Sequence, residues 1–213
     1  MTIQSIPCKR TNYGGKRAGK VQYIVVHYTA GHNDNPVNNG KYFGRADVGA
    51  SAHYFVDADT IVASVPEDYI AWHCGGAYYY CDCRNSNSIG VEICTRYTNG
   101  EYWFDPAAVE HAAEFVRYLM RKHNVPLDHV IRHFDVTPKN CPAPMCGEHH
   151  GEWLRFKELL MRYDTIEEVP EWGKATVQKL IDKKLLNGDG NGLDLSRDML
   201  RLLVIQDRAG QFG

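Results

Sequence analysis

Apolar residues along the first two thirds of the chain follow two different periods. Short apolar runs at residues 23–29 and 88–94 are typical of β-strands. Residues 51–65 predict a β-hairpin with its turn at residues 57–59. Strands interspersed with helical segments predict an α/β fold with a mixed central β-sheet flanked by helices.

One long amphipathic helix stands out between these runs and the C-terminal part. Asp105 is a favourable N-cap, and Pro106 suits the first helical position. Apolar residues then recur at intervals of three and four as far as Met120, so the helix is expected to end before Asn124. A further helix is predicted over residues 151–163.

The character of the chain changes after Tyr163. The next seven residues are acidic and turn-prone, and two helical patterns follow, at residues 172–186 and 196–208. We therefore predict one domain over residues 1–163 and a small helical C-terminal module over residues 164–213. The module is too short for a large core of its own.

The glycine-rich connection within the module could be a calcium loop or a simple turn. Its polar residues fall near EF-hand ligand positions: Asn187, Asp189, Asn191, Gly192 and Asp198. The first ligand is normally an acid, and Asp194 stands where an apolar residue is usual. A glycine-rich turn is therefore the favoured interpretation.

The charge balance limits the partners of this 213-residue chain. Its 24 Lys and Arg nearly match its 26 Asp and Glu, which gives no basic field for a nucleic acid. No apolar stretch is long enough to span a membrane. The first residues lack the apolar core of a signal peptide. We therefore expect the protein to stay in the cytoplasm of the producing cell until it is released.

The seven cysteines cannot all pair within one chain, because their number is odd. Reduced, partly buried thiols are the favoured interpretation, while one or more disulfides or a second metal site stay open. The cysteines whose redox state is left open are Cys8, Cys74, Cys81, Cys83, Cys94 and Cys146.

The strongest chemical signal is the segment from His133 to Pro142. It places an imidazole, the cation Lys139 and the thiol of Cys141 on one short loop. His27, at the end of an apolar run, is the candidate third ligand. Three dispersed ligands that leave a fourth position to water are typical of a catalytic zinc site, whereas structural zinc sites take four protein ligands.

Five segments in order extend this signal. They are Val-His-Tyr-Thr at 26–29, Ser-Ala-His-Tyr-Phe-Val-Asp at 51–57, Ala-Trp-His-Cys-Gly at 71–75, Asn-Ser-Ile-Gly-Val-Glu at 87–92 and His-Phe-Asp-Val-Thr-Pro-Lys-Asn-Cys-Pro at 133–142. With them, residues 20–163 resemble the zinc-dependent N-acetylmuramoyl-L-alanine amidases, which include phage lysozyme-type enzymes and are related to the peptidoglycan recognition proteins. The resemblance implies an endolysin of a phage or prophage that degrades bacterial peptidoglycan.

The resemblance also implies roles for individual residues. His27, His133 and Cys141 correspond to the zinc ligands, and Glu92 and Lys139 fall on positions that carry catalytic side chains. We expect Glu92 to act as general base and Lys139 to stabilise an oxyanion. We also expect His53 and His73 to bind substrate, with a core position or support of a ligand as the alternative for His53.

Ala52 is a departure from some related phage amidases. Those relatives carry a catalytic tyrosine at this position, and an alanine cannot supply its phenol. The sequence therefore shifts the catalytic role towards Glu92.

Two other functions and several roles for the module stay open. A non-catalytic peptidoglycan-binding protein is the main alternative, although retention of Cys141 with both histidines argues against it. A cysteine-nucleophile or redox enzyme is weaker. The module could bind the wall, pack on the first domain or form a homodimer, and it faintly resembles surface-layer-homology segments that anchor proteins to walls.

Overall fold

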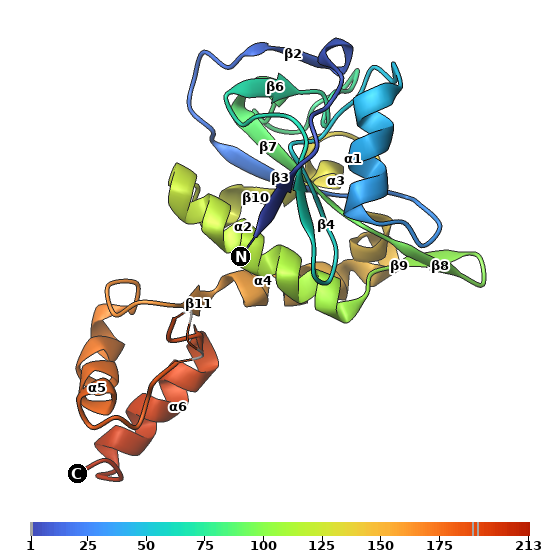
Figure 1. Ribbon diagram of the computed structural model, residues 1–213. Coiled ribbons are helices and arrows are strands. Elements are labelled where there is room, and N and C mark those ends of the chain that lie inside the picture. Colours follow the sequence, from blue (N-terminus) through green and yellow to red (C-terminus); the bar gives the residue numbers. More distant parts are fainter. Residues whose placement is uncertain (1, 189, 191) are drawn as a thin grey trace. The chain divides into compact units, whose positions relative to one another are not determined.

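The computed structural model describes residues 2–188, 190 and 192–213 and divides them into two compact units (Figure 1). One unit ends at Phe156 and the other begins at Lys157, inside helix α4 (His150–Leu160). The division lies before the composition change at residue 163. Strand β11 (Arg162–Tyr163) pairs with β12 (Leu195–Ser196), so residues 162 and 163 belong with the C-terminal part.

The first unit is built on a six-stranded sheet in the order β1-β5-β4-β7-β3-β10. Strand β4 pairs in parallel with β7, β7 with β3, and β3 with β10, whereas β4 and β5 are antiparallel. The predicted α/β fold with a mixed sheet is confirmed. The strands are β1 (Ile3–Ser5), β3 (Tyr23–Tyr28), β4 (Tyr54–Val56), β5 (Ile61–Ala63), β7 (Ser88–Ile93) and β10 (Val130–Arg132).

Helices cover both faces of this sheet. Successive strand residues point to opposite faces, and in β4 the Phe55 ring packs on Phe43 of α1 (Pro36–Arg45). The adjacent Tyr54 packs edge-on against Phe115 of α2 (Pro106–His123). Helix α1 therefore lies on one face and α2 on the other.

The predicted long helix has the expected ends. The Asp105 side chain accepts a hydrogen bond from the N–H of Ala107, and Pro106 occupies the first turn. Asn124 takes the left-handed conformation at the C-terminus, which favours asparagine among non-glycine residues. The predicted hairpin at residues 51–65 is also present, as the antiparallel pair β4 and β5.

Smaller elements complete the first unit. Strands β2 (Tyr13–Lys16) and β6 (Tyr69–Ala71) form one antiparallel pair, and β8 (Arg96–Thr98) and β9 (Glu101–Trp103) form another. Helix α3 (His133–Val136) is a single turn, so the segment predicted as a loop begins as a helix. Five 3-10 turns lie at Arg10–Asn12, Asn85–Asn87, Leu127–His129, Ala143–Met145 and Gly147–His149.

The second unit has a small apolar core. Helices α5 (Glu171–Asp182) and α6 (Arg197–Arg208) pack around a buried cluster: Val169, Val177, Leu195, Leu200 and Val204. Gly188 and Gly190 have positive φ, as a glycine-rich turn requires. Asp189 and Asn191, on which the calcium alternative depends, lie outside the described residues.

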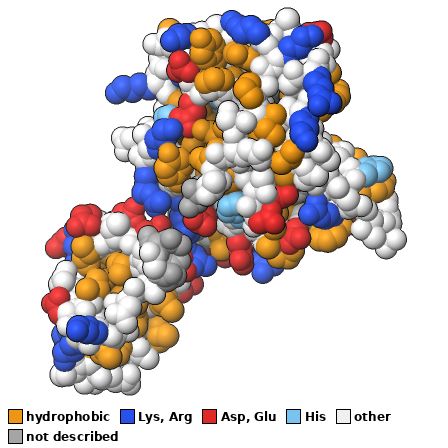
Figure 2. Space-filling model, in the orientation of Figure 1, with side chains coloured by type: hydrophobic (Ala, Val, Ile, Leu, Met, Phe, Trp, Pro, Cys, Tyr) orange, Lys and Arg blue, Asp and Glu red, His pale blue; other side chains and the backbone are white. Residues whose placement is uncertain are grey.

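The surface carries no single field of charge on the face that Figure 2 shows, where acidic and basic side chains occur on both units. Within the described part of the chain, no helix is long and apolar enough to cross a membrane. All seven cysteines are free, and all but the half-buried Cys81 are buried.

Candidate active site

Three predicted ligands come together at one end of the sheet. His27 lies in β3, His133 begins α3 directly after β10, and Cys141 follows on the connection beyond it. One donor atom from each lies within 4.8 Å of the other two, and all three residues are buried. Among the described residues this is the only such cluster of potential metal ligands.

Strand register explains how distant residues meet. His27 pairs with Glu92 across β3 and β7, and Arg132 pairs with Val26 across β3 and β10. His133 is therefore next to His27 at the carboxyl end of the neighbouring strand. Ligand sites in α/β sheets favour the carboxyl ends of parallel strands, and three of them supply this site.

The donor atoms suit a cation that binds neutral imidazoles and a thiolate. Neither ring nitrogen of His133 has a hydrogen-bond partner among the described residues, although both are buried. The Cys141 Sγ lies 3.5 Å from His27 Nδ1. Two zinc ligands at about 2.0–2.3 Å from the ion would be separated by roughly this distance in a tetrahedral site. The residues therefore fit a bound zinc ion.

Burial sets the protonation of these groups. It acts together with the positive charge of Lys139 to lower the pKa of His27 well below its ordinary value and that of His133 to about 4. Burial also raises the pKa of the Cys141 thiol, which the backbone N–H of Tyr28 partly offsets by a hydrogen bond. The imidazoles are thus held neutral, ready to bind a metal, while the thiolate needs a nearby cation.

His73 and Ser88 fix the tautomer of His27. The Ser88 hydroxyl donates to the Arg84 carbonyl at 2.7 Å, so it must accept from His73 Nε2, 3.1 Å away. The Nδ1 atom of a neutral His73 is then an acceptor, and it lies 3.0 Å from His27 Nε2. The proton of His27 is therefore on Nε2, and its Nδ1 lone pair faces Cys141.

Gly90 makes room for this chain of hydrogen bonds. A Cβ at position 90 would lie 2.5 Å from Cγ of His73, which no side chain can tolerate. The Asn85 side chain accepts hydrogen bonds from the backbone N–H groups of His73 and Cys74, and so holds the segment in place. His73 is therefore fixed behind His27.

Glu92 is the acid of the site. The residue keeps some solvent exposure, but its Oε2 atom is buried without a hydrogen-bond partner. Burial raises the pKa of Glu92 to about 8, although the positive charge of Lys139 opposes the shift. A carboxyl group with a pKa near neutrality is suited to both accepting and donating a proton.

Lys139 is exposed, beside the buried donors. Its charge acts on His27, His133, Glu92 and Cys141. Two backbone hydrogen bonds tighten the turn around it, from Lys139 N to Thr137 O at 2.7 Å and from Cys141 N to Lys139 O at 2.8 Å.

His53 lies in a different setting. It is fully buried; its Nδ1 accepts from the N–H of Gly90 at 3.0 Å, and its Nε2 lies 3.2 Å from the Tyr69 carbonyl. Both nitrogens therefore have protein partners, as do those of His73, and their contact with a substrate stays a prediction. Ala52 is buried beside Phe55 and Val62, so no phenol reaches the site from that position.

The fold and this cluster of potential metal ligands agree with one known protein family. Residues 17–144 match the model of the N-acetylmuramoyl-L-alanine amidase family, and the chain belongs to that family. BlyA, an N-acetylmuramoyl-L-alanine amidase of Bacillus subtilis (strain 168), is 33% identical over 157 residues, which cover 67% of this chain and 42% of BlyA. CwlL of Bacillus licheniformis is 34% identical over 148 residues, which cover 65% of this chain and 40% of CwlL. The chain thus spans less than half the length of either relative.

Solved structures agree with this assignment. The catalytic domain of XlyA is 26% identical with a TM-score of 0.62, and the match covers 75% of this chain and 99% of that one. A mutant endolysin from Bacillus subtilis is 27% identical with a TM-score of 0.61 and the same coverage of both chains. The sequence-based assignment to the amidase family is confirmed.

Some residues that shape the site were not predicted. Ser88 and Gly90 lie inside a recognised segment, but nothing in the sequence connects them to His73. The sequence also gives no sign that the backbone N–H of Tyr28 forms a hydrogen bond with the Cys141 thiol. The phenol ring of Tyr28 packs edge-on against Tyr102.

Proposed function

We propose that this chain hydrolyses the amide bond between N-acetylmuramic acid and L-alanine in bacterial peptidoglycan, with a zinc ion as cofactor. One observation carries the proposal: three buried donor atoms converge beside a buried, unpaired carboxylate oxygen on the adjacent strand. Membership of the amidase family supports the choice of bond. The named relatives support it as well.

His27, His133 and Cys141 would hold the zinc, through two imidazoles and a thiolate. Zinc supplies Lewis acidity, which polarises a carbonyl group and lowers the pKa of water towards about 7. The role of the protein is to hold these donor atoms close together in a buried position. The His73–Ser88 chain orients His27, since such outer hydrogen bonds fix the ring of a ligating histidine.

Glu92 would move the proton. As the attacking water adds to the substrate carbonyl, the carboxylate accepts a proton from it, and the resulting acid donates that proton to the departing amine of alanine. The raised pKa of Glu92 suits both halves of this transfer. Its unpaired Oε2 is the atom free to take part.

Lys139 would stabilise the negative charge that develops on the carbonyl oxygen. The charge of its ammonium group acts on the four groups that we assign to the metal and the proton: His27, His133, Cys141 and Glu92. Charge stabilisation of this kind by one donor contributes about 3–4 kcal/mol in other enzymes.

Product analysis tests the proposal. Purified bacterial walls are digested with the zinc-loaded protein, and the soluble products are examined by mass spectrometry and by amino-terminal labelling. We expect free stem peptides with new L-alanine amino termini. New reducing sugar ends without such termini would identify a glycosidase, and wall binding without any product would favour the non-catalytic alternative.

The second unit is given a separate role. We infer that it serves binding to the wall, so that the enzyme acts there after release from the producing cell. Domain packing and homodimerisation are the competing roles, and measurement of the mass in solution distinguishes the latter.

A further inference from the structure

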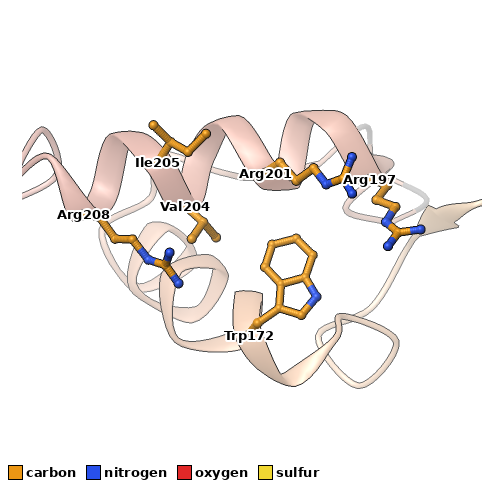
Figure 3. A pocket seen from close by; sticks show the side chains of 6 residues that line it. All are labelled: Trp172, Arg197, Arg201, Val204, Ile205 and Arg208. Atoms are coloured by element: carbon orange, nitrogen blue, oxygen red, sulfur yellow. The ribbon is translucent and has the colours of Figure 1, made fainter.

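The second unit carries a cavity of about 390 Å³ between α5 and α6. Six residues line it: Trp172, Arg197, Arg201, Val204, Ile205 and Arg208. Figure 3 shows the Trp172 indole projecting from α5 towards α6, with the arginine side chains on both sides of it. The size of the cavity is at the small end of ligand pockets in proteins.

The three arginines share one face of α6. They are four and seven residues apart, which at 3.6 residues per turn places them within about 40° of one another. Their Cα atoms are separated by about 6 and about 10 Å along the helix axis. The face is thus a short row of guanidinium groups, and all three side chains are exposed.

These arginines lack the strong partners that other cations of the unit have. Arg162 pairs with Asp194 at 2.6 Å and Lys179 with Asp207 at 2.6 Å. In the described part of the chain, Arg197 and Arg208 have no acidic partner, and Arg201 has only a 3.4 Å contact with the exposed Asp198. Like charges four residues apart destabilise a helix, so a bound anion would relieve this repulsion.

Apolar surface lies beside the charge. Trp172 and Ile205 remain 44% and 64% exposed, although Trp is among the largest apolar side chains. An exposed indole offers a flat face to a sugar ring or polyol chain, and guanidinium groups form paired hydrogen bonds with phosphate oxygens. Together they match a ligand that alternates phosphate with carbohydrate.

We propose that this cavity binds an anionic polymer of the bacterial wall in which polyol or sugar units are joined by phosphodiesters. The choice of a wall polymer as the ligand rests on the proposed amidase function, whereas the phosphate and carbohydrate chemistry rests on the cavity alone. Single-stranded nucleic acid also combines phosphates with stacking groups. It is disfavoured because Trp172 is the one aromatic residue among the described residues that line the cavity, whereas proteins that bind single strands stack successive bases on several aromatic side chains.

The test uses the full chain and purified poly(glycerol phosphate), with binding measured by calorimetry. The wild-type protein binds the polymer, and salt weakens binding because phosphate contacts release counterions. The double variant Arg201→Gln/Arg208→Gln binds roughly 100-fold more weakly, at about tenfold for each charged hydrogen-bonding group. Trp172→Ala weakens binding of the polymer more than it weakens binding of inorganic phosphate.

A matched control removes the same charge elsewhere. Lys174 and Lys184 lie in the same unit outside the cavity, so Lys174→Gln/Lys184→Gln should keep wild-type affinity. Equal losses in both double variants would overturn the proposal, since only net charge would then matter. It would equally fail if the polymer did not bind, or if an oligothymidylate bound at least as tightly. Hydrolysis of a soluble muramoyl peptide, measured in parallel, stays at the wild-type rate in the arginine variant and reports separately on the amidase site.

Discussion

The potential metal site of the first unit and the arginine-lined cavity of the second unit place their polar groups in opposite environments. At the sheet, three potential ligands are buried, and neither ring nitrogen of His133 nor the Oε2 atom of Glu92 has a hydrogen-bond partner among the described residues. On α6, three charged groups stay in water beside an exposed tryptophan. Burial shifts the pKa values of the first site, whereas the arginines of the second are exposed to solvent. Changes at the first site should therefore have large effects, and changes at the second graded ones.

The largest effect should follow the loss of the thiolate. Cys141→Ser should reduce zinc content and amide hydrolysis by more than about 100-fold, since even changes behind a metal ligand cost 10–100-fold. Metal analysis and peptide release measure this effect. Cys8→Ser, the same change at a buried thiol in another core cluster, should be nearly silent. If Cys141→Ser kept full zinc content and hydrolysed walls, Cys141 would not be a required zinc ligand.

Next in size is the loss of the acid. Glu92→Gln should retain zinc but lose about 10²–10⁴-fold in the rate of hydrolysis, the usual contribution of a positioned general base. Glu101→Gln, on an exposed strand, serves as the control. If Glu92→Gln hydrolysed walls at the wild-type rate, the proton transfer would have to be assigned to another residue.

A smaller effect should come from the support of His27. Ser88→Ala and His73→Gln disturb the chain that holds His27 in its Nε2–H form, so zinc affinity should fall about 10–100-fold. Competition with a chelator measures the affinity. Ser86→Ala removes an exposed hydroxyl nearby and should have no effect. Unchanged zinc affinity in both support variants would mean that the hydrogen-bond chain does not position the ligand.

The smallest effect concerns stability. Burial tends to raise the pKa of Glu67, but hydrogen bonds from Tyr54 and Lys122 and the charge of His123 hold it below its ordinary value. A carboxyl group whose pKa is lowered in the folded state stabilises the fold at pH values above its pKa in the unfolded state. That contribution is lost as the pH falls through the pKa of the folded state. Glu67→Gln should therefore be destabilised by about 1 kcal/mol at pH 7 and should differ less from the wild type near pH 3, because the wild type loses this contribution as the pH falls. Urea unfolding at both pH values tests this, and a difference independent of pH would contradict it.

Local patterns predicted the elements that carry their own signals. The apolar runs of β3 and β7, the hairpin and the capped helix α2 were all evident in the sequence. Helix α1 was not, because its residues include two glycines and two asparagines, which are poor helix formers. Packing stabilises it instead: Phe43 stacks on Phe55, and a Cβ at Gly40 would already touch Val62 at 3.0 Å.

The site was predicted as a set of residues but not as an arrangement. Short motifs identified the candidate ligands and Glu92, since residue type and spacing are local. The alignment of His133 with His27 depends on the register of β10, a three-residue strand with no clear pattern. The His73–Ser88 chain and the space left by Gly90 depend on the folded chain in the same way. Long-range register and hydrogen bonding are therefore what the sequence left open.

X-ray absorption spectroscopy of the zinc-loaded protein tests the central claim most directly, because it counts the donor atoms around the metal. The arrangement of His27, His133 and Cys141 predicts one zinc per chain with two nitrogen ligands, one sulfur ligand and one further light atom. Loss of the sulfur signal in Cys141→Ser would identify its source. A zinc ion with no sulfur ligand, or with several, would contradict the assignment of this cluster as the catalytic metal site.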